Sequence, residues 1–471
     1  MLVGVAATLF YALTSAGWIA HVDVIQSQAV AQAIADHHRL WFTSFPTSPI
    51  HLIWPGDAVR GVGGHLYGKH AVGYILLMVP ITEAQHLNLV GWRVADFCIG
   101  MINPAAIGAT VAIVYRMMVA LSKDRRISLV GASIVAVSTL LWPYAHVPYD
   151  AGPTTLGVTV ALAALFSLRS GIRWQLTLLA GLGLGLAVLV RNDSLLFVAI
   201  DAVWLAVILW RRTIRTIVIQ SLAFFAPIAG ALAVTAWYNL ARFGSVTQSG
   251  YIHDASLQRQ NPVSLNLLGL LISPGKGVLI FCPVLLVAAL GLPWLFRRSF
   301  ELGLVIVVTV LLALVAYASL RNWSLAFSWG PRYLIPFIPM AMLPLIGLLM
   351  TWRERSLLVR VGSSLLIVLS SLIQALGVAS PWIAVDILHL NFLHPLVNTA
   401  WTRGQIWWNA DWVARQLSQG HLRWIDIFWI SKSSPISLHG TAVFLLAIAM
   451  VIGLAFTVRA LLRAAPRPEA S

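Results

Sequence analysis

Charged residues are scarce in this sequence, and their scarcity excludes a soluble globular protein. Only 10% of the 471 residues are charged and 59% are hydrophobic. The mean hydropathy is +0.84, whereas soluble domains carry about 25% charged residues. Hydrophobic runs recur from one end of the chain to the other. We therefore predict an all-α, polytopic membrane protein.

Recognisable signatures of nucleotide, metal and disulfide chemistry are also missing. The chain has no Walker loop, no GxGxxG after a strand and no HExxH, and its 13 histidines show no metal-ligand spacing. The two cysteines, Cys98 and Cys282, lie in or beside apolar segments, so a structural disulfide is not expected. We predict no cofactor and no metal, and leave open one alternative, a weakly held divalent cation near Asp23.

Membrane topology explains the net charge of +15 better than nucleic-acid binding does. Most Lys and Arg residues lie in short segments that the positive-inside rule assigns to the cytoplasm: 123–126, 169–173, 211–215, 297–298, 353–360 and 459–467. The extracytoplasmic loops are then 21–70, 143–153, 191–194, 239–266, 321–332 and 379–437. Cations beyond those that set topology would serve anionic lipid or lipid phosphate.

About twelve spans, in a range of about 11 to 14, fit this sidedness, because each needs roughly 20 apolar residues. They are predicted at 2–20, 93–121, 127–142, 154–168, 175–190, 195–210, 216–238, 278–296, 302–320, 333–351, 357–378 and 438–460. Segments 72–87 and 265–272 are interpreted as juxtamembrane or re-entrant helices, so the number of passes between residues 70 and 122 stays open. Alternating glycines from Gly181 to Gly185 favour close helix packing.

The large first outer loop, residues 21–74, is the candidate catalytic surface, because a loop of this length between spans is usually functional or disordered and this one is rich in aromatic residues. Asp23 opens the loop. The residues after it, 26–35, form a pattern typical of an amphipathic helix lying at the membrane interface. A carboxylate at this rim can act as general base toward an acceptor hydroxyl, and the alternative is that Asp23 only caps this helix.

Four cations lie near span ends on the same predicted side: Lys69, Arg191, Lys276 and Arg332. Together they could converge on a phosphate, whereas each alone could simply snorkel to the headgroups. Asp150 could assist the base or cap the next helix. Tyr251 could contact substrate or anchor the chain at the interface. Interfacial anchoring, with stacking on a sugar or lipid as the alternative, is also expected of the tryptophans that crowd the last outer loop: Trp401, Trp407, Trp408, Trp412, Trp424 and Trp429.

These motifs, taken in order, resemble the C-type, polyprenyl-phosphate-dependent glycosyltransferase superfamily, in the bacterial branch related to protein mannosyltransferases and aminoarabinose transferases. Asp23 after the first span and the following helix are similar to family features. The other similar segments are Tyr67-Gly68-Lys69-His70-Ala71-Val72-Gly73, 141–145, 185–193, 238–244, 273–277 and 330–333. Two departures are Val24 in place of a second acidic residue and His70-Ala71 in place of prolines after the lysine.

The resemblance covers about residues 1–350, which it implies to be the transferase module with catalytic loop 21–74. Residues 351–471 would form the C-terminal spans with outer loop 379–437. The resemblance implies a GT-C fold in the inner (plasma) membrane with an extracytoplasmic active site, and a hexosyl- or pentosyltransferase. A polyprenyl-phosphate sugar would be the donor, and a cell-envelope glycan, lipid or protein hydroxyl the acceptor.

The implied reaction is an inverting displacement with Asp23 as base, assisted by Asp150. The four cations would hold the donor phosphate, and Tyr67, His70 and Tyr251 would contact substrate. Two rival functions are a lipid-linked glycan flippase or transporter and an O-antigen-ligase-like enzyme. Substitution of Asp23 discriminates, because it should matter little in either rival.

Overall fold

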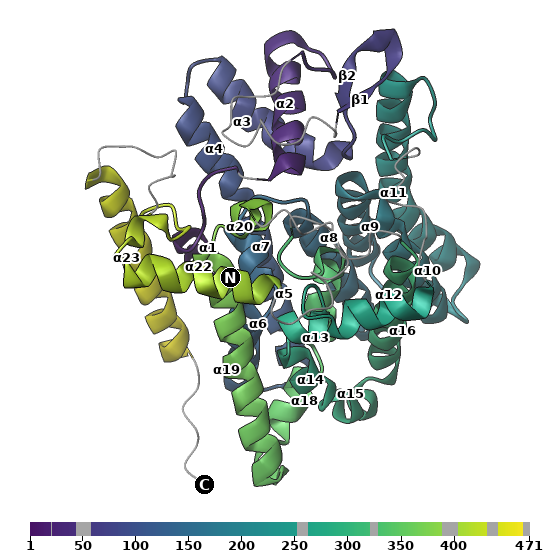
Figure 1. The fold of residues 1–471 in the computed structure, drawn as a ribbon. Coiled ribbons are helices and arrows are strands. Elements are labelled where there is room, and N and C mark those ends of the chain that lie inside the picture. The colour runs from purple at the N-terminus through teal and green to yellow at the C-terminus, as the bar shows by residue number, and fades with distance from the viewer. Residues whose placement is uncertain are drawn as a thin grey trace.

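The computed structural model describes residues 1–19, 21–43, 58–251, 262–320, 328–388, 404–430 and 441–464. These residues are almost entirely helical, with one small antiparallel hairpin, as Figure 1 shows. In the described part of the chain, seven segments are long and apolar enough to cross a membrane: Trp92–Ser122, Ala151–Ser170, Asn192–Leu209, Ile214–Phe243, Phe300–Ala318, Arg332–Met350 and Leu357–Ala379. Four shorter apolar helices accompany them: Leu2–Leu13, Trp174–Val190, Val263–Ile272 and Leu445–Leu461. The predicted all-α, polytopic membrane architecture is confirmed.

The helices of the membrane part are α1 (Leu2–Leu13), α4 (Trp92–Gly100), α5 (Ile102–Ser122), α6 (Arg125–Ser138), α7 (Leu141–His146), α8 (Ala151–Ser167), α9 (Trp174–Val190), α10 (Leu195–Leu209), α11 (Ile214–Phe243), α16 (Phe300–Ala318), α19 (Leu357–Ala379) and α23 (Thr441–Ala464). The remaining described elements discussed below are α2 (Val22–His37), β1 (Ala58–Arg60), β2 (Leu66–Gly68), α3 (Val72–His86), η4 (Leu168–Ser170), η5 (Asn192–Ser194), α12 (Val263–Ile272), α20 (Trp382–Leu388) and α22 (Gln405–Ser418).

Two predicted continuous spans are broken. Residues 278–296 form α13 (Val278–Phe281), α14 (Val284–Ala289) and α15 (Leu292–Arg298), and residues 333–351 form η7 (Arg332–Phe337), α17 (Ile338–Ala341) and α18 (Leu345–Met350). Proline explains both sets of breaks, because it lacks the amide proton that continues a helix. Pro283 separates α13 from α14 and Pro293 lies in the first turn of α15, while Pro336 lies inside η7, Pro339 in the first turn of α17 and Pro344 at the N-cap of α18.

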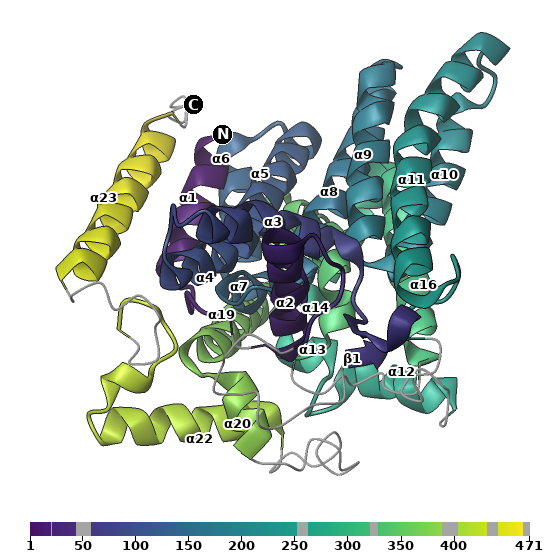
Figure 2. The same ribbon diagram turned by 90° about the horizontal axis from the view of Figure 1, so that it is seen from above.

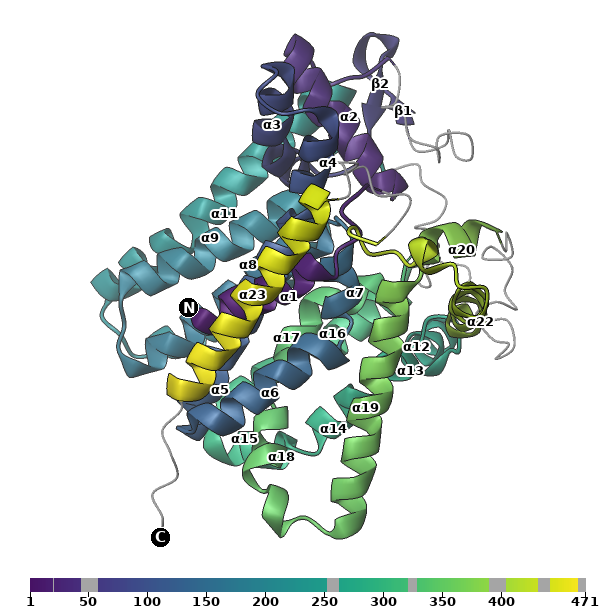
Figure 3. The ribbon, with the colours of Figure 1, turned by 90° about the vertical axis from the view of Figure 1, so that its left-hand side faces the viewer.

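The first outer loop forms a compact layer in which α2 lies beside α3 and the β1–β2 hairpin (Figures 1 and 3). Residues 26–35 form a helix as predicted, but the helix is not amphipathic, and its place at the membrane interface stays a prediction. Val24, Gln26 and Val30, on different sides of α2, are all buried. On one side Thr82 of α3 donates a hydrogen bond to the Ala31 carbonyl. The cause is tertiary: α3 and β2 cover faces that the sequence alone leaves open to solvent.

Helix α9 packs closely against both α8 and α11, and Figure 2 shows the three helices side by side. A Cβ atom on Gly183 would lie 2.5 Å from the Gly157 carbonyl oxygen of α8, and one on Gly181 would lie 2.3 Å from the Phe224 carbonyl oxygen of α11. The alternating glycines therefore let α9 approach two helices at once, which confirms the predicted close packing.

The described C-terminal elements pack back onto the N-terminal half, with α23 against α1 and α19 against α6 and α7. We call residues 425–430 the terminal clasp, because they close on the loop after α1. The Phe428 amide donates to the Ser15 carbonyl at 2.9 Å. The Asp426 carboxylate accepts from the Trp18 indole at 3.0 Å and contacts His146 Nε2 at 3.2 Å. The division of the chain at residue 350 stays a prediction.

Candidate active site at one rim of the membrane region

A cavity of about 450 Å³ lies where the ends of α2, α8, α9 and η7 meet. Segments far apart in sequence line it: Asp23, Val24, Ser27, His70, Ala71, Tyr74, Tyr149, Asp150, Val190, Arg191, Asn192, Asp193, Leu196, Ser249, Tyr251, Ala316, Tyr317, Leu320, Arg332 and Tyr333. All of these segments were assigned to, or next to, the same side of the membrane. The cavity brings together six of the nine predicted site residues, which are Asp23, His70, Asp150, Arg191, Tyr251 and Arg332.

Asp23 stands in the first turn of α2 with its carboxylate in the cavity. The residue at the N-cap is His21, whose Nδ1 accepts a hydrogen bond from the Asp23 amide at 3.1 Å. The alternative that Asp23 merely caps this helix is therefore wrong. Because His21 performs the capping, the Asp23 side chain is available for contacts across the cavity.

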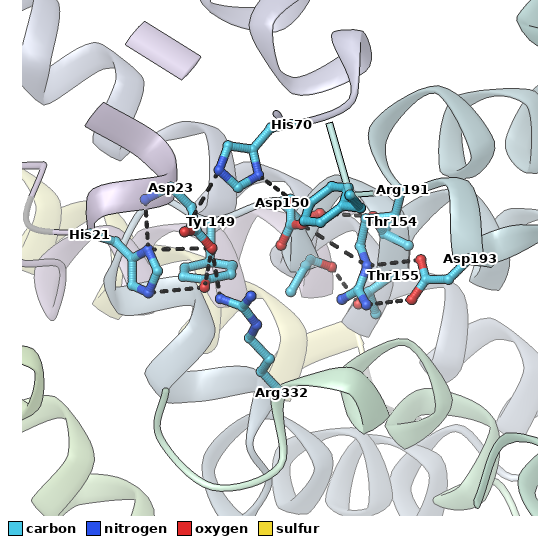
Figure 4. Close-up of polar contacts among 12 residues, drawn as sticks. His21, Asp23, His70, Tyr149, Asp150, Thr154, Thr155, Arg191, Asp193 and Arg332 are labelled. Atoms are coloured by element: carbon cyan, nitrogen blue, oxygen red, sulfur yellow. Dashed lines mark hydrogen bonds and ion pairs between the residues drawn. The ribbon is translucent and has the colours of Figure 1, made fainter. Parts of the chain in front are cut away.

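The Asp23 carboxylate is the centre of a polar network, drawn in Figure 4. Its Oδ2 accepts from Arg332 Nη1 at 2.8 Å and from the Tyr149 hydroxyl at 3.0 Å, and its Oδ1 lies 3.7 Å from His70 Nε2. Burial raises the pKa of the Asp23 carboxyl, but the nearby positive groups, chiefly Arg332 and then His70 and Lys69, hold that pKa well below its usual range. Asp23 is therefore ionised throughout the physiological pH range.

Tyr149 connects His21 to Asp23. Its hydroxyl lies 3.0 Å from His21 Nε2 and 3.0 Å from Asp23 Oδ2 (Figure 4). Nδ1 of His21 accepts from a backbone amide, so Nε2 carries the ring proton and donates to the Tyr149 oxygen. The tyrosine proton is then directed at the Asp23 carboxylate. This chain and Arg332, whose guanidinium carbon lies 5.0 Å from the centre of the Tyr149 ring, together fix the orientation of the carboxylate.

Asp150 presents a contrasting carboxyl in the same cavity. It occupies the N-cap position of α8, but its side chain makes no capping hydrogen bond. Its Oδ1 has no hydrogen-bond partner among the described residues, and its Oδ2 lies 4.0 Å from Arg191 Nε. Burial raises the pKa of Asp150 to about 7, with Arg191 opposing the rise and Asp23 and Asp193 adding to it. This carboxyl therefore exchanges its proton near neutral pH.

Arg191 is buried at the wall of the cavity, between α9 and η5. Its guanidinium donates two hydrogen bonds to Asp193, at 3.2 and 2.6 Å, and Asp193 also accepts from the Tyr317 hydroxyl at 2.9 Å. The Tyr333 ring lies 5.2 Å from the guanidinium carbon. These contacts hold the Arg191 guanidinium in one orientation.

The two predicted lysines lie elsewhere. Lys69 does not line the cavity; its ammonium lies 5.3 Å from the centre of the Tyr251 ring and its charge acts on Asp23. Lys276 is buried and donates to the carbonyl and hydroxyl of Ser328 and to Gln405 Oε1. These contacts link the segment before Arg332 to α22. The phosphate-binding role of both lysines stays a prediction.

Of the three predicted substrate contacts, two face the cavity. Tyr251 donates to or accepts from His70 Nδ1 at 2.9 Å, and both side chains line the wall. Tyr67 is buried in β2, where its hydroxyl donates to the Val62 carbonyl at 3.2 Å, and it does not line the cavity.

Arg242 of α11, which the sequence analysis did not single out, positions this part of the loop. Its buried guanidinium donates to the carbonyls of Gly68 and His70 and to Asn239 Oδ1. Tyr149, His21 and Asp193 were missed as well, although each neighbours a predicted residue. Proximity in sequence to Asp23, Asp150 and Arg191 was the available signal.

In the described ranges, no group of three or more His, Cys, Asp or Glu side chains is arranged to hold a metal ion. The weakly held divalent cation near Asp23 stays an expectation. Of the six tryptophans of the last outer loop, Trp401 lies outside the described residues, while Trp407, Trp424 and Trp429 are exposed.

Comparison with known proteins identifies the fold. No protein-family model matches the sequence, and no curated protein matches it. The crystal structure of ArnT from Cupriavidus metallidurans bound to undecaprenyl phosphate is similar, with a TM-score of 0.52 and 14% identity over 98% of this chain and 76% of that one. The apo structure of the same ArnT gives a TM-score of 0.49 and 14% identity over 96% and 74%. The likeness to the first structure shows the fold, and the GT-C architecture implied by the motifs is confirmed.

Proposed function

Starting from this fold, we propose that the protein is a membrane glycosyltransferase that moves a single sugar from a polyprenyl-phosphate donor to an extracytoplasmic acceptor hydroxyl. The observation that carries the proposal is the cavity at one rim, which holds two carboxyls, Asp23 and Asp150, opposite two guanidinium groups, Arg191 and Arg332. The similar ArnT structure contains undecaprenyl phosphate, which supports a lipid-phosphate donor here. The membrane would be the inner (plasma) membrane, with the cavity on the outside.

The guanidinium groups are suited to the donor phosphate. Each is now paired with a carboxylate, Arg332 with Asp23 and Arg191 with Asp193. Two oxygens of a phosphate can accept a bidentate pair of hydrogen bonds from arginine, as a carboxylate does. Donor binding would therefore exchange at least the Arg332–Asp23 contact for an Arg332–phosphate contact. As the glycosidic bond breaks, negative charge grows on that phosphate, and the cations stabilise it where it develops.

We assign Asp23 as the general base. It is already ionised, and the hydrogen bond from Tyr149 directs its carboxylate. Its lowered pKa makes it a weak base while Arg332 is bound to it. Withdrawal of Arg332 to the phosphate, and the phosphate's own charge, would both raise the pKa of Asp23. Donor binding thus prepares the base, which removes the proton of the acceptor hydroxyl as the hydroxyl attacks the anomeric carbon with inversion.

Asp150 is the second candidate for the base, and a specific observation favours it. Its pKa is raised to about 7 and one of its oxygens has no partner among the described residues. A base with a pKa near the working pH is the more effective kind. The two assignments differ in their pH dependence, because loss of the Asp150 charge would reduce the rate below pH 7 while Asp23 would remain ionised.

The rivals are a flippase or transporter and an O-antigen-ligase-like enzyme. Transporters place their binding charges near mid-membrane on broken helices, whereas the charges here lie at the ends of α8 and α9. Substitution of Asp23 separates the proposal from both rivals, since neither assigns that residue a chemical role.

The test compares Asp23→Asn with Asp150→Asn in turnover of a polyprenyl-phosphate sugar. Asp36→Asn is the matched control, because Asp36 lies on the same helix, is about half exposed and pairs only with His86 among the described residues, at 2.9 Å. If Asp23 is the base, Asp23→Asn should lower turnover by about 100- to 10,000-fold, with donor affinity retained and Asp36→Asn near wild type. The parent enzyme should then show no fall in kcat/KM between pH 7.5 and 6. Two results together would make Asp150 the general base instead. Turnover of Asp23→Asn would be near normal, and kcat/KM of the parent would fall between pH 7.5 and 6 while that of Asp150→Asn would not. If the protein moved the donor across the membrane without transferring its sugar, the proposed transferase activity would be wrong.

A further inference from the structure

A second and larger cavity, of about 790 Å³, lies at the opposite end of the α8–α9 hairpin. It is bounded by α5, α8, η4, α9 and the end of α15, and is lined by Ile113, Arg116, Met117, Ala120, Leu121, Lys123, Val160, Ala163, Ala164, Phe166, Ser167, Arg169, Ser170, Gly171, Arg173, Leu176, Leu179, Arg298 and Ser299. Nothing in the proposed sugar transfer uses these residues.

The two cavities face opposite sides of the membrane region. Asp150, which lines the first cavity, immediately precedes α8, and Ser167, which lines the second, is its last residue. An α-helix of this length rises about 25 Å. Residues 123–126 and 169–173, which the positive-inside rule places in the cytoplasm, border the second cavity. A ligand there would come from the cytoplasmic leaflet or from the cytoplasm.

The rim of the second cavity is strongly cationic. Five cations line it, Arg116, Lys123, Arg169, Arg173 and Arg298, and no carboxylate does so in the described part of the chain. Arg169 is partly neutralised by Glu301, at 3.5 Å, and Arg298 donates to the Leu121 carbonyl at 3.0 Å.

The other three cations are unengaged. Across the described ranges, the side chains of Arg116, Lys123 and Arg173 make no hydrogen bond or ion pair, and all three are exposed. Snorkelling alone accounts for cations at this level, but not for their arrangement around a hollow.

Below the cations the walls are apolar. Val160, Ala163 and Phe166 of α8 line the cavity together with Leu176 and Leu179 of α9. Val160 precedes the cation Arg169 by nine residues, which in a helix is about 13 Å of depth. The cavity therefore combines a ring of phosphate-binding groups with an apolar trench that runs into the membrane. A soluble phosphate would use only the ring.

We propose that this cavity binds an anionic glycerophospholipid of the cytoplasmic leaflet. The headgroup phosphate lies among Arg116, Lys123 and Arg173, and part of an acyl chain lies along the trench between α8 and α9. Basic pockets between membrane helices on the cytoplasmic side are suited to such headgroups. The proposal does not depend on the sugar-transfer reaction, because it concerns the other end of the helices.

The test measures binding of short-chain phosphatidylglycerol to the full-length, delipidated protein in neutral detergent. Phosphatidylcholine with the same chains has no net headgroup charge, so its binding measures the contribution of the apolar trench. Glycerol phosphate has no acyl chains, so its binding measures the contribution of the phosphate. The double variant Arg116→Gln/Arg173→Gln removes two cavity cations. Arg212→Gln/Arg215→Gln is the matched control, since both residues are exposed, lie on the same predicted side and do not line the cavity.

Phosphatidylglycerol should bind the parent and the control alike, and bind the cavity variant roughly 30-fold more weakly, the size expected from two cations near anionic lipid phosphate. Phosphatidylcholine and glycerol phosphate should each bind far more weakly than phosphatidylglycerol. Equal losses in the two double variants would show diffuse surface charge and overturn the site. Glycerol phosphate binding as tightly as the lipid would make the occupant a soluble phosphate and overturn the lipid.

Discussion

At the scale of single residues, Asp23 and Asp150 are chemically alike and lie in one cavity, yet their environments separate their proton affinities. Arg332 and the Tyr149 hydroxyl contact Asp23, while the closest cation to Asp150, Arg191, is 4.0 Å away and already paired. The sequence could predict both carboxyls because each is a charge at a span end. It could not predict their different states, which depend on partners that are distant in the sequence, Tyr149 and Arg332 for Asp23 and Arg191 for Asp150.

The raised pKa of Asp150 has a consequence for stability. A carboxyl with a pKa of about 7 in the folded protein and an ordinary one in the unfolded chain makes the folded state bind the extra proton, so its favourable contribution is lost as the pH rises through 7. Asp150→Asn removes this penalty. Thermal unfolding at pH 5.5 and 8.5 should show the variant gaining more stability over the parent at pH 8.5 than at pH 5.5, because the parent loses the contribution progressively between the ordinary carboxyl pKa and about 7. A gain of equal size at both pH values would contradict the raised pKa.

The lysines Lys69 and Lys276 should behave differently although the sequence treated them alike. Lys69→Ala should weaken donor binding by about 1.5–3 kcal/mol, the range for hydrogen bonds to charged groups. Lys276→Ala should leave donor affinity nearly unchanged and lower stability by about 1–3 kcal/mol, because it removes a buried donor to Ser328 and Gln405. Donor affinity and melting temperature measured side by side check both. Equal loss of donor affinity in the two variants would return Lys276 to the phosphate site.

At the scale of elements, hydrophobic runs and basic clusters were sufficient to predict most of the membrane helices. The predicted segment 357–378 corresponds to Leu357–Ala379, and 216–238 lies within Ile214–Phe243. The failures have different causes: proline breaks two predicted spans, and the burial of a helix depends on what covers its faces. The mixed composition of α2 suggested an interfacial helix, but neighbouring elements bury it. The β1–β2 hairpin was not predicted either, since its two strands have only three residues each.

Gly73, at the second position of α3, sets the distance between α3 and α9. A Cβ atom there would lie 2.5 Å from the Leu189 carbonyl carbon and 2.6 Å from the Val190 nitrogen, immediately before Arg191. Gly73→Ala should therefore cost about 1–3 kcal/mol of stability and also weaken donor binding. Gly230→Ala, in α11, meets no atom within 4 Å and should be neutral or stabilising by about 0.5–1 kcal/mol. Unfolding and donor affinity of both variants provide the check, and a harmless Gly73→Ala would refute the close contact.

At the scale of the whole molecule, the α8–α9 hairpin connects two cavities of different character. The cavity at the Asp150 end contains carboxyls and guanidinium groups in contact with each other, and the other is lined by cations without carboxylates. The sequence analysis placed the basic clusters on one side and Asp23, Asp150 and the four candidate cations on the other, which agrees with the linings of the two cavities. It could not predict that the basic clusters surround a second cavity, since that requires the packing of α5, α8 and α9.

The sidedness itself is testable with single cysteines in a Cys98→Ser background, since Cys98 is exposed and Cys282 is buried. Val62→Cys, at an exposed position between the strands, should react with an impermeant maleimide on intact cells. Arg125→Cys should react only after the membrane is permeabilised. Labelling of the reverse pattern would invert the topology and place the candidate active site in the cytoplasm.

The terminal clasp also determines when during synthesis the fold can be completed. Trp18 and Asp426 are hydrogen-bonded although 408 residues separate them. At about 5–20 residues per second, the ribosome makes Asp426 roughly 20–80 seconds after it has made Trp18. Throughout that interval the loop after α1 has no clasp to close on. Until then the loop after α1 can make only its earlier contacts, such as those of Ser15 and Ala16 with the His146 carbonyl, and a late step of assembly returns residues near the end of the chain to residues near its start.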